Sequence, residues 1–156
     1  VIIVMGVIMM GINVNNNGIV VTLTSRVNKR SNTICAGLGY KIVDAIAYLG
    51  DFDEANAILG IDENDNEIYI GKSVDGTFEI HDNLPPTPDE PMPDQVVVTA
   101  SAVDSSRNQY KLKELYLLWV DNFDNPTERY VYCKASVSIF KPALKYLGIV
   151  WRIMIE

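Results

Sequence analysis

The residues that could carry out chemistry are few in this chain of 156 residues. The only histidine, His81, is followed by Asp82, and a histidine held by a carboxylate can serve as a general base in hydrolysis. Neither a Gly-x-Ser-x-Gly elbow nor another nucleophile signature accompanies this pair. A small hydrolase that uses His81 and Asp82 is therefore the third choice of function, and no catalytic residue is assigned.

Oxygen-bearing side chains are dense in the middle of the chain, where Asp62, Asn64 and Asn66 match the first three ligand positions of an EF-hand calcium loop. The sixth position of that loop requires Gly and the twelfth requires Glu, whereas this chain has Glu67 and Ser73 there. An EF-hand is therefore excluded. The sequence predicts no cofactor and no metal site, and it leaves open only weak calcium binding by the acidic segment.

The two cysteines, Cys35 and Cys133, lie far apart and form no Cys-x-x-Cys motif. Zinc-ribbon, haem-attachment and thioredoxin-type sites are excluded, because each needs ligands at such a spacing. Two buried thiols are the simpler interpretation. A disulfide between the two halves is the alternative for an extracellular protein, and two cysteines do not decide the compartment.

Charge is distributed unevenly along the chain, which has 13 basic and 20 acidic residues and a formal net charge of -7. Residues 1–25 carry no charge, residues 26–50 carry +3, residues 51–94 carry -12 and residues 95–156 carry +2. Nucleic-acid binders need lysines and arginines to neutralise phosphates, so an acidic chain argues against them. No apolar run reaches the roughly 18 residues of a membrane-spanning helix. We therefore expect neither nucleic acid as a partner nor a membrane span.

Residues 1–12 contain no polar side chain, and a turn signal, Asn13 to Gly18, and a β-branched stretch, Ile19 to Val27, follow them. The first segment lacks the basic start and the cleavage site of a signal peptide, so we interpret it as a long strand in a β-hairpin. A strand that is apolar on both faces avoids a wet sheet edge. It should be central in its own sheet or covered by a neighbouring subunit, for example through strand donation.

This uncharged strand and the basic stretch after the second strand are the predicted assembly contacts. If the basic stretch pairs with the acidic middle of a neighbouring copy, assembly should weaken as the salt concentration rises. The predicted interface residues are Val1, Ile2, Ile3, Val4, Val7, Ile8, Arg26, Lys29 and Arg30.

Two helices are predicted between the hairpin and the acidic middle. A Ser-Asn-Thr sequence at residues 31–33 can cap the first, and Gly50 is placed to end it. Its apolar stripe consists of Ile34, Leu38, Ile42, Ile46 and Leu49. A second, short helix is predicted from about Asp53 to Leu59, closed by Gly60.

The dipeptide Asp75-Gly76 predicts a two-residue hairpin turn between the strands on either side of it. In that register Lys72 lies opposite Glu79. The only cation of the acidic middle would then neutralise one carboxylate across the two strands.

A proline-rich segment, residues 84–94, contains five of the seven prolines and should be extended. It is either a spacer between two lobes or a long strap on the surface. The predicted organisation is an N-terminal part at residues 1–83, this strap or linker, and an antiparallel β region at residues 95–156. The first and last parts form two small domains or a single one.

Four strands are predicted after the strap, at Gln95 to Val103, Tyr110 to Val120, Arg129 to Phe140 and Leu147 to Ile155, although the second also fits a helical period. In the third strand, one predicted face holds Val131, Cys133, Ala135, Val137 and Ile139, and the other holds Tyr130, Tyr132, Lys134, Ser136 and Ser138. Trp119 and Trp151 fall in apolar runs and are expected in the core.

The predicted fold class is mainly β with one or two helices (α+β), with an antiparallel sandwich or jelly-roll-like sheet in the C-terminal half. Apolar strands at both ends, a proline strap and a surface rich in Asn, Ser, Thr and Tyr favour a non-enzymatic assembly subunit, such as a virion component or a surface filament. Its partners would be copies of itself or other assembly subunits, in an extracellular or virion setting. The alternative is a β-sandwich binding module that presents Tyr130 and Tyr132 to a glycan or a protein.

Overall fold

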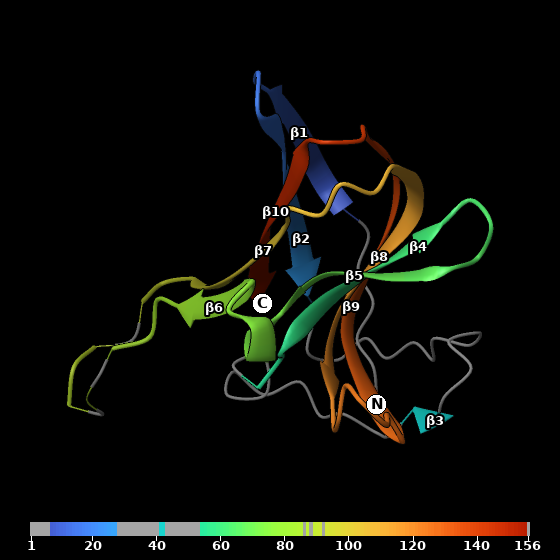
Figure 1. Cartoon of the computed structure of the whole chain (residues 1–156). Coiled ribbons are helices and arrows are strands. Elements are labelled where there is room, and N and C mark those ends of the chain that lie inside the picture. The colour runs from blue at the N-terminus through green and yellow to red at the C-terminus, as the bar shows by residue number, and fades with distance from the viewer. Residues whose placement is uncertain are drawn as a thin grey trace.

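Two five-stranded β-sheets form the part of the chain that the computed structural model describes, namely residues 7–27, 41–42 and 54–155 except 86, 88 and 92 (Figure 1). The first sheet contains, in spatial order, β1 (Val7–Val14), β2 (Gly18–Val27), β10 (Tyr146–Ile155), β7 (Val96–Asp104) and β6 (Phe78–Asp82). The second sheet contains β3 (Lys41–Ile42), β9 (Glu128–Lys141), β8 (Tyr110–Val120), β4 (Ala57–Asp62) and β5 (Glu67–Lys72). Neighbouring strands are antiparallel, except that β2 with β10 and β3 with β9 are parallel.

The two sheets pack face to face, and the chain crosses between them repeatedly. β5 leads through a short 3-10 helix, η1 (Ser73–Asp75), into β6 of the first sheet, β7 leads into β8, and β9 leads into β10. Each of these strands buries apolar side chains between the sheets. The core cluster there includes Val21, Leu23, Ile58, Val98, Leu115, Leu117, Ile149 and Trp151.

The mainly β fold and the sandwich predicted for the C-terminal half are confirmed. The four predicted strands are β7 to β10, and each predicted end lies within one residue of the observed end. Residues 110–120 form a strand and not a helix, since β8 pairs with both β4 and β9. Trp151 is fully buried, and its Nε1–H donates to Ser25 Oγ at 2.9 Å, which satisfies the indole in the core.

The described residues contain no α-helix, so the short helix predicted at residues 53–59 is wrong. β4 occupies this region and pairs with β5 on one side and β8 on the other. Ile58 faces the core between the sheets, whereas Leu59 is buried on the opposite face of the second sheet. A strand buried on both faces shows no alternation, so its apolar run also fits a helical period. Of the first predicted helix, residues 41–42 form strand β3, and the other positions lie outside the described residues.

β5 and β6 do not form the predicted hairpin at Asp75-Gly76, because they belong to different sheets. Gly76 does adopt the positive φ, 70°, that its turn sequence indicates. The chain then crosses to the first sheet, where Glu79 pairs with Ser101 of β7 and not with Lys72. Lys72 Nζ instead lies 3.4 Å from the Asp75 carboxylate. The turn sequence therefore predicted the local backbone conformation at Gly76. It did not predict that β6 joins the first sheet, because that pairing depends on packing in the core.

A β-bulge in β9 corrects the predicted assignment of its faces. Cys133 pairs with Leu117 and Val131 pairs with Leu118, so Tyr132 is an extra residue on β9. Tyr132 and Cys133 therefore both reach the core between the sheets, while Val131 packs on the other face of the second sheet. One inserted residue thus separates Val131 from Cys133, which the alternation had placed together.

The other face of the second sheet is buried by a second apolar cluster. Its members are Leu59, Ile61, Tyr116, Leu118, Val120 and Val131, with Tyr69 and Phe123 packed against them. Arg129 of β9 is also buried and donates two hydrogen bonds to the Glu67 carboxylate, at 2.9 and 2.7 Å. The bidentate geometry compensates the cost of burying the guanidinium charge.

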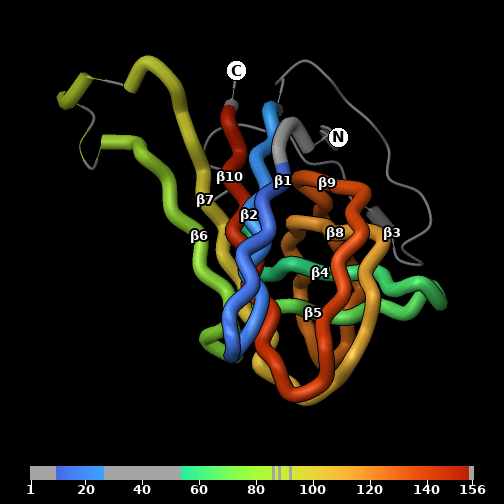
Figure 2. Tube along the Cα trace, turned by 90° about the horizontal axis from the view of Figure 1, so that it is seen from above, coloured from blue at the N-terminus to red at the C-terminus, as the bar shows by residue number. Residues whose placement is uncertain are grey.

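The proline-rich segment joins β6 to β7, which are neighbours in the first sheet, and it extends away from the sheets in Figure 2. Asn83 anchors the start of the segment: its side chain accepts from Val97 N–H at 2.9 Å and donates to Gln95 O at 2.8 Å. The described carboxylates of the segment are all exposed, at Asp89, Glu90 and Asp94.

Lys141 is a buried cation at the end of β9. Its Nζ donates to Ser106 O at 2.8 Å and to Asn108 O, and it lies 5.5 Å from the centre of the Tyr110 ring. The Tyr110 hydroxyl donates to Asp104 at 2.6 Å. Burial, together with this hydrogen bond and the Asp104 charge, raises the pKa of Tyr110 above its ordinary value. The cluster ties the loop between β7 and β8 to the end of β9.

Replacing Lys141 by methionine should destabilise the protein by about 2 kcal/mol, because partly buried carbonyls lose their donor while the apolar volume is retained. Urea unfolding followed by tryptophan fluorescence measures the change. Lys111→Met is the matched control, since Lys111 is exposed and its ion pair with Glu63, at 3.4 Å, should contribute no more than about 0.5 kcal/mol. Equal losses in the two variants would contradict the role assigned to Lys141.

Leu144, in the corner between β9 and β10, has a φ of 67° and is 73% exposed. This left-handed conformation costs a residue with a Cβ roughly 1–2 kcal/mol. Leu144→Gly should therefore raise the free energy of unfolding by up to about 1 kcal/mol, after the larger unfolded-state entropy of glycine is subtracted. Ala143→Gly is the control, because Ala143 is exposed but has no positive φ, and that variant should be less stable than the parent. If Leu144→Gly had a lower Tm than the parent protein in thermal unfolding, the backbone of Leu144 would not be strained.

Candidate assembly surface

β1 is the outermost strand of the first sheet, and it pairs with β2 through a tight turn. Asn15 N–H donates to Gly18 O at 2.9 Å, and the Asn15 side-chain oxygen accepts from Asn17 N–H and Gly18 N–H. The predicted hairpin is therefore confirmed for the described residues. No other described strand lies against the outer side of β1. Among the described strands, β1 thus does not hold the central position that was one of the two expectations for it.

Three apolar side chains of β1 lie on the core side of the first sheet but outside the core. We call Met10, Ile12 and Val14 the apolar row. Each pairs with a residue of β2 that is buried in the core, as Ile12 does with Val21. Directly paired residues share a face of the sheet, so the row continues the core face. Yet its members are 42%, 52% and 65% exposed, respectively, which places them beyond the part of that face that is covered.

Tyr146 fixes the turn of this hairpin to β10. Its ring lies so close to Gly18 that a Cβ on the glycine would be 2.5 Å from ring carbons, and its hydroxyl accepts from Asn15 Nδ2 at 3.0 Å. Lys145 adds a hydrogen bond from its Nζ to Asn16 O at 2.7 Å. The hairpin is therefore held by β10, and the apolar row lies on a preformed edge.

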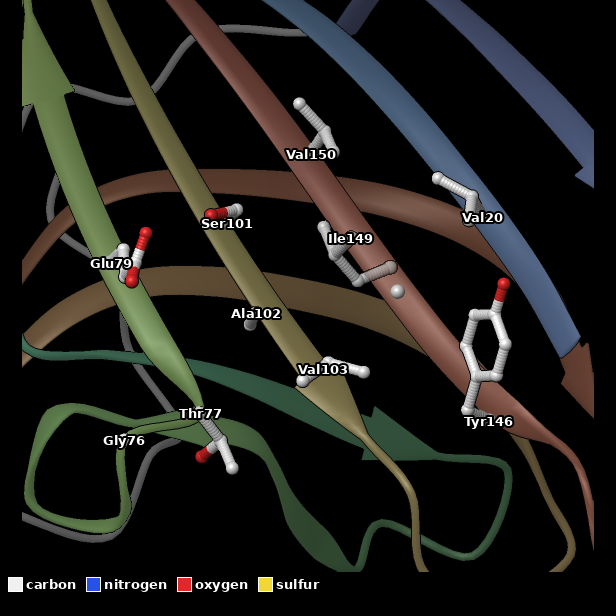
Figure 3. Close-up of a pocket in the computed structure, with 11 residues that line it drawn as sticks. Val20, Gly76, Thr77, Glu79, Ser101, Ala102, Val103, Tyr146, Ile149 and Val150 are labelled. Carbon is white, nitrogen blue, oxygen red and sulfur yellow. The ribbon is translucent and has the colours of Figure 1, made fainter.

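A shallow groove of about 330 Å³ crosses the outer face of the first sheet (Figure 3). Tyr146 and Val20 stand at one end and Glu79 and Ser101 stand at the other. Gly148, which pairs with Val20 and Val103, contributes a small residue between them. Of the described residues, no histidine or cysteine lines the groove. Its lining offers apolar contact and a few hydrogen-bonding groups, namely the Thr77 and Ser101 hydroxyls and the Glu79 carboxylate.

His81 and Asp82 are not arranged as a catalytic pair. His81 is exposed on β6, and its Nε2 lies 3.4 Å from Glu79 Oε2 on the same strand. Asp82 Oδ1 accepts the N–H of Leu84 at 2.9 Å, which fixes the start of the proline-rich segment. Successive side chains of a strand point to opposite faces, so the strand itself separates the two groups.

Asp62 uses its carboxylate to organise the turn between β4 and β5. It accepts hydrogen bonds from the N–H groups of Asn64 and Asn66, at 2.9 and 2.8 Å, and from Asn66 Nδ2 at 3.1 Å. Desolvation raises the pKa of Asp62, but these hydrogen bonds outweigh it and hold that pKa below its ordinary value. Among the described residues, no group of three or more His, Cys, Asp or Glu side chains is arranged to hold a metal ion.

The tyrosines considered for a binding face are packed into the protein. Tyr132 is buried, and Tyr130 is half-buried against Trp119, with ring centroids 5.0 Å apart. They form no exposed aromatic row on the second sheet. Cys133 is buried, as predicted, whereas Cys35 lies outside the described residues.

Lysines of β8 neutralise carboxylates of the turn between β4 and β5. Lys111 Nζ lies 3.4 Å from Glu63, and Lys113 pairs with Asp65. The acidic middle of the chain is therefore partly neutralised within the same molecule. This leaves less negative charge for the basic stretch of a neighbouring copy, and that contact stays a prediction.

The structure describes part of the predicted interface. Arg26 is exposed on β2, and Val7 and Ile8 belong to β1. The other predicted interface residues lie outside the described residues, namely Val1, Ile2, Ile3, Val4, Lys29 and Arg30.

Sequence reasoning missed the apolar row, Asn15 and Tyr146 as parts of this surface. The row had a partial signal, because Met10 and Ile12 occupy alternate positions of the predicted strand, whereas Val14 was assigned to the turn. Tyr146 had none, because its contact with Gly18 depends on a pairing between strands that are far apart in the sequence.

The chain matches no protein-family model, no curated protein and no solved structure. The described residues include no helix that is long and apolar enough to cross a membrane. The function is therefore argued from the geometry of the chain itself.

Gly18→Ala should destabilise the protein by about 1–3 kcal/mol, because the added methyl group overlaps the Tyr146 ring. Gly11→Ala is the matched control in the same hairpin. A Cβ at Gly11 meets no atom within 4 Å, so this change should be neutral or slightly stabilising. Chemical denaturation compares the two variants, and equal stabilities would mean that Tyr146 does not hold the turn.

Proposed function

We propose that this chain is a non-enzymatic assembly subunit, such as a component of a virion or of a surface filament, and that a neighbouring subunit covers β1. The observation that carries the proposal is the apolar row, which is exposed on an edge strand without charge or proline. Exposed edge strands of this kind are sites at which protein chains pair.

The other edges of the described sheets carry the features that keep edge strands from pairing. β6 has five residues, includes Glu79, His81 and Asp82, and continues into the proline-rich segment. β5 begins with Glu67 and ends with Lys72. β3 covers β9 only at Glu128 and Arg129, and the rest of this edge, among the described residues, includes the charged Lys134. Charge, proline and short length are the usual protection of a sheet edge. β1 has eight residues and none of these protections, which supports a contact at this edge.

The C-terminal apolar strand gives the proposal no support. Apolar strands at both ends of the chain favoured an assembly subunit in the sequence, but β10 lies between β2 and β7 in its own sheet. Trp151 and Ile153 are fully buried there by the same chain. The N-terminal hairpin alone therefore carries the structural argument for assembly.

A β-sandwich module that binds a glycan or a protein is the second candidate, and the groove in Figure 3 is the observation that favours it. Tyr146 supplies an aromatic ring at one end, and Glu79 supplies a hydrogen-bond acceptor at the other. A chain that stays monomeric at all concentrations and binds an oligosaccharide at this groove would favour the binding module over the assembly subunit.

Ile12→Lys should lower the association constant of the chain by at least about tenfold, because a charge placed in an apolar contact costs more than about 1.4 kcal/mol. Light scattering on the full chain over a range of concentrations measures the association. Thr22→Lys is the matched control, since Thr22 is exposed on β2 and lies on the opposite face of the sheet from the apolar row. A parent chain that is monomeric throughout the range would refute the proposed function.

A further inference from the structure

The backbone of β1 has a defined pattern of outward-facing hydrogen-bond groups. The bond from Asn15 N–H to Gly18 O makes these two residues a hydrogen-bonded pair. In an antiparallel ladder such pairs alternate with non-hydrogen-bonded pairs. Counting back from Asn15, the three residues of the apolar row occupy non-hydrogen-bonded positions. Their N–H and C=O groups therefore point away from β2, toward the open edge.

From this pattern we propose that the subunit covering β1 is a second copy of this chain, a conclusion that rests on the proposed function and names its partner. The two β1 strands pair in antiparallel orientation about a two-fold axis at Ile12. In this register Ile12 of one copy faces Ile12 of the other, and Met10 of each copy faces Val14 of the other. All of these are hydrogen-bonded pairs, so the outward backbone groups of both apolar rows are satisfied.

The side chains agree with this register. The two apolar rows come to lie side by side on one face and form a single apolar strip. On the other face Gly11 of each copy lies opposite Asn13 of the other, and the space around Gly11 is open. A shift of one residue would set the outward groups of one strand against positions whose backbone groups point toward their own β2.

A β-bulge near the start of β1 also limits which registers are possible between the two copies. The pairing of β1 with β2 shifts between Val7 and Met9, so Ile8 is an extra residue there. A register centred nearer the start of β1 would bring this bulge into the contact. The register at Ile12 uses only the regular part, residues 10–14.

Charge allows two copies to meet at this edge although each has a net charge of -7. Residues 1–25 carry no charge, so the paired strands bring no like charges together. The acidic proline-rich segment is attached to β6, at the opposite edge of the first sheet. Four strand spacings, about 19 Å, separate β1 from β6, and this exceeds the screening length of about 10 Å at 0.1 M salt.

The contact is small, because five residues per copy form the regular pairing, against roughly 20–30 per side in a standard protein interface. Pairing should therefore be reversible and depend on protein concentration. Covalent trapping of a defined register is the appropriate test, with light scattering as the independent measure of association.

Cysteine pairs report the register directly, in variants that all carry Cys35→Ser and retain the buried Cys133. On mild oxidation Ile12→Cys should link to itself, and a mixture of Met10→Cys with Val14→Cys should give a species of twice the chain mass. Neither Met10→Cys nor Val14→Cys should link alone. In this register the same position in the two copies is offset by four residues along the strands, which is about 14 Å. A disulfide needs Cα atoms within about 7 Å of each other.

Thr22→Cys is the control for random collision, since Thr22 is exposed on β2 and faces away from the predicted strip. If the parent chain associates but the mixed pair does not link above this control, the two-fold register is wrong and the proposed function survives. Linking of Met10→Cys to itself would also overturn the register. A strictly monomeric parent chain would overturn both the register and the proposed function.

Discussion

The parallel pairing of β2 with β10 is the contact on which the rest of the described structure depends. It runs for ten residues and joins a strand near the start of the chain to the last described strand. The buried hydrogen bond from Trp151 to Ser25 crosses it in the core, and the Tyr146 ring covers Gly18 at one end. Because β10 also pairs with β7, this contact attaches the β1–β2 hairpin to the sandwich. A two-stranded hairpin without such an attachment is marginally stable in water.

The same attachment accounts for the exposure of the apolar row. β2 lies directly beside β10 and still buries Val21 and Leu23 in the core, whereas β1 lies one strand farther out. The row therefore has the composition of a core face without the cover that a core face needs. Pairing with a second strand extends the sheet and places a second apolar row beside the first, because the backbone groups of these three residues point to the open edge and their side chains point to one face.

Local patterns predicted the strands but not all of their partners or faces. Turn-forming residues on both sides of β8 gave its bounds correctly, and the asparagine-rich turn gave the β1–β2 hairpin. β4 was predicted as a helix because burial on both faces removes alternation, and the faces of β9 were misassigned because a single bulge at Tyr132 leaves no mark in the sequence. The sequence likewise predicted the strand that forms the candidate surface, β1, from its uncharged residues. Which of its side chains stay outside the core depends on a second sheet that no local pattern describes.

Among its described strands the first sheet has one unprotected edge, and this limits how the chain can assemble. Two-fold pairing through β1 uses that edge in both copies, and the resulting pair then presents, at its outer sides, β6 with its charges and proline-rich segment. Such a contact is closed, so a shell or a filament needs a second, different contact between pairs. The exposed carboxylates of the proline-rich segment and the basic stretch at residues 26–30 have opposite charge and suit that second contact. The first contact would be apolar and insensitive to screening, whereas the second would weaken as salt rises. Raising the ionic strength would therefore break the contacts between pairs and leave the two-fold pairs intact.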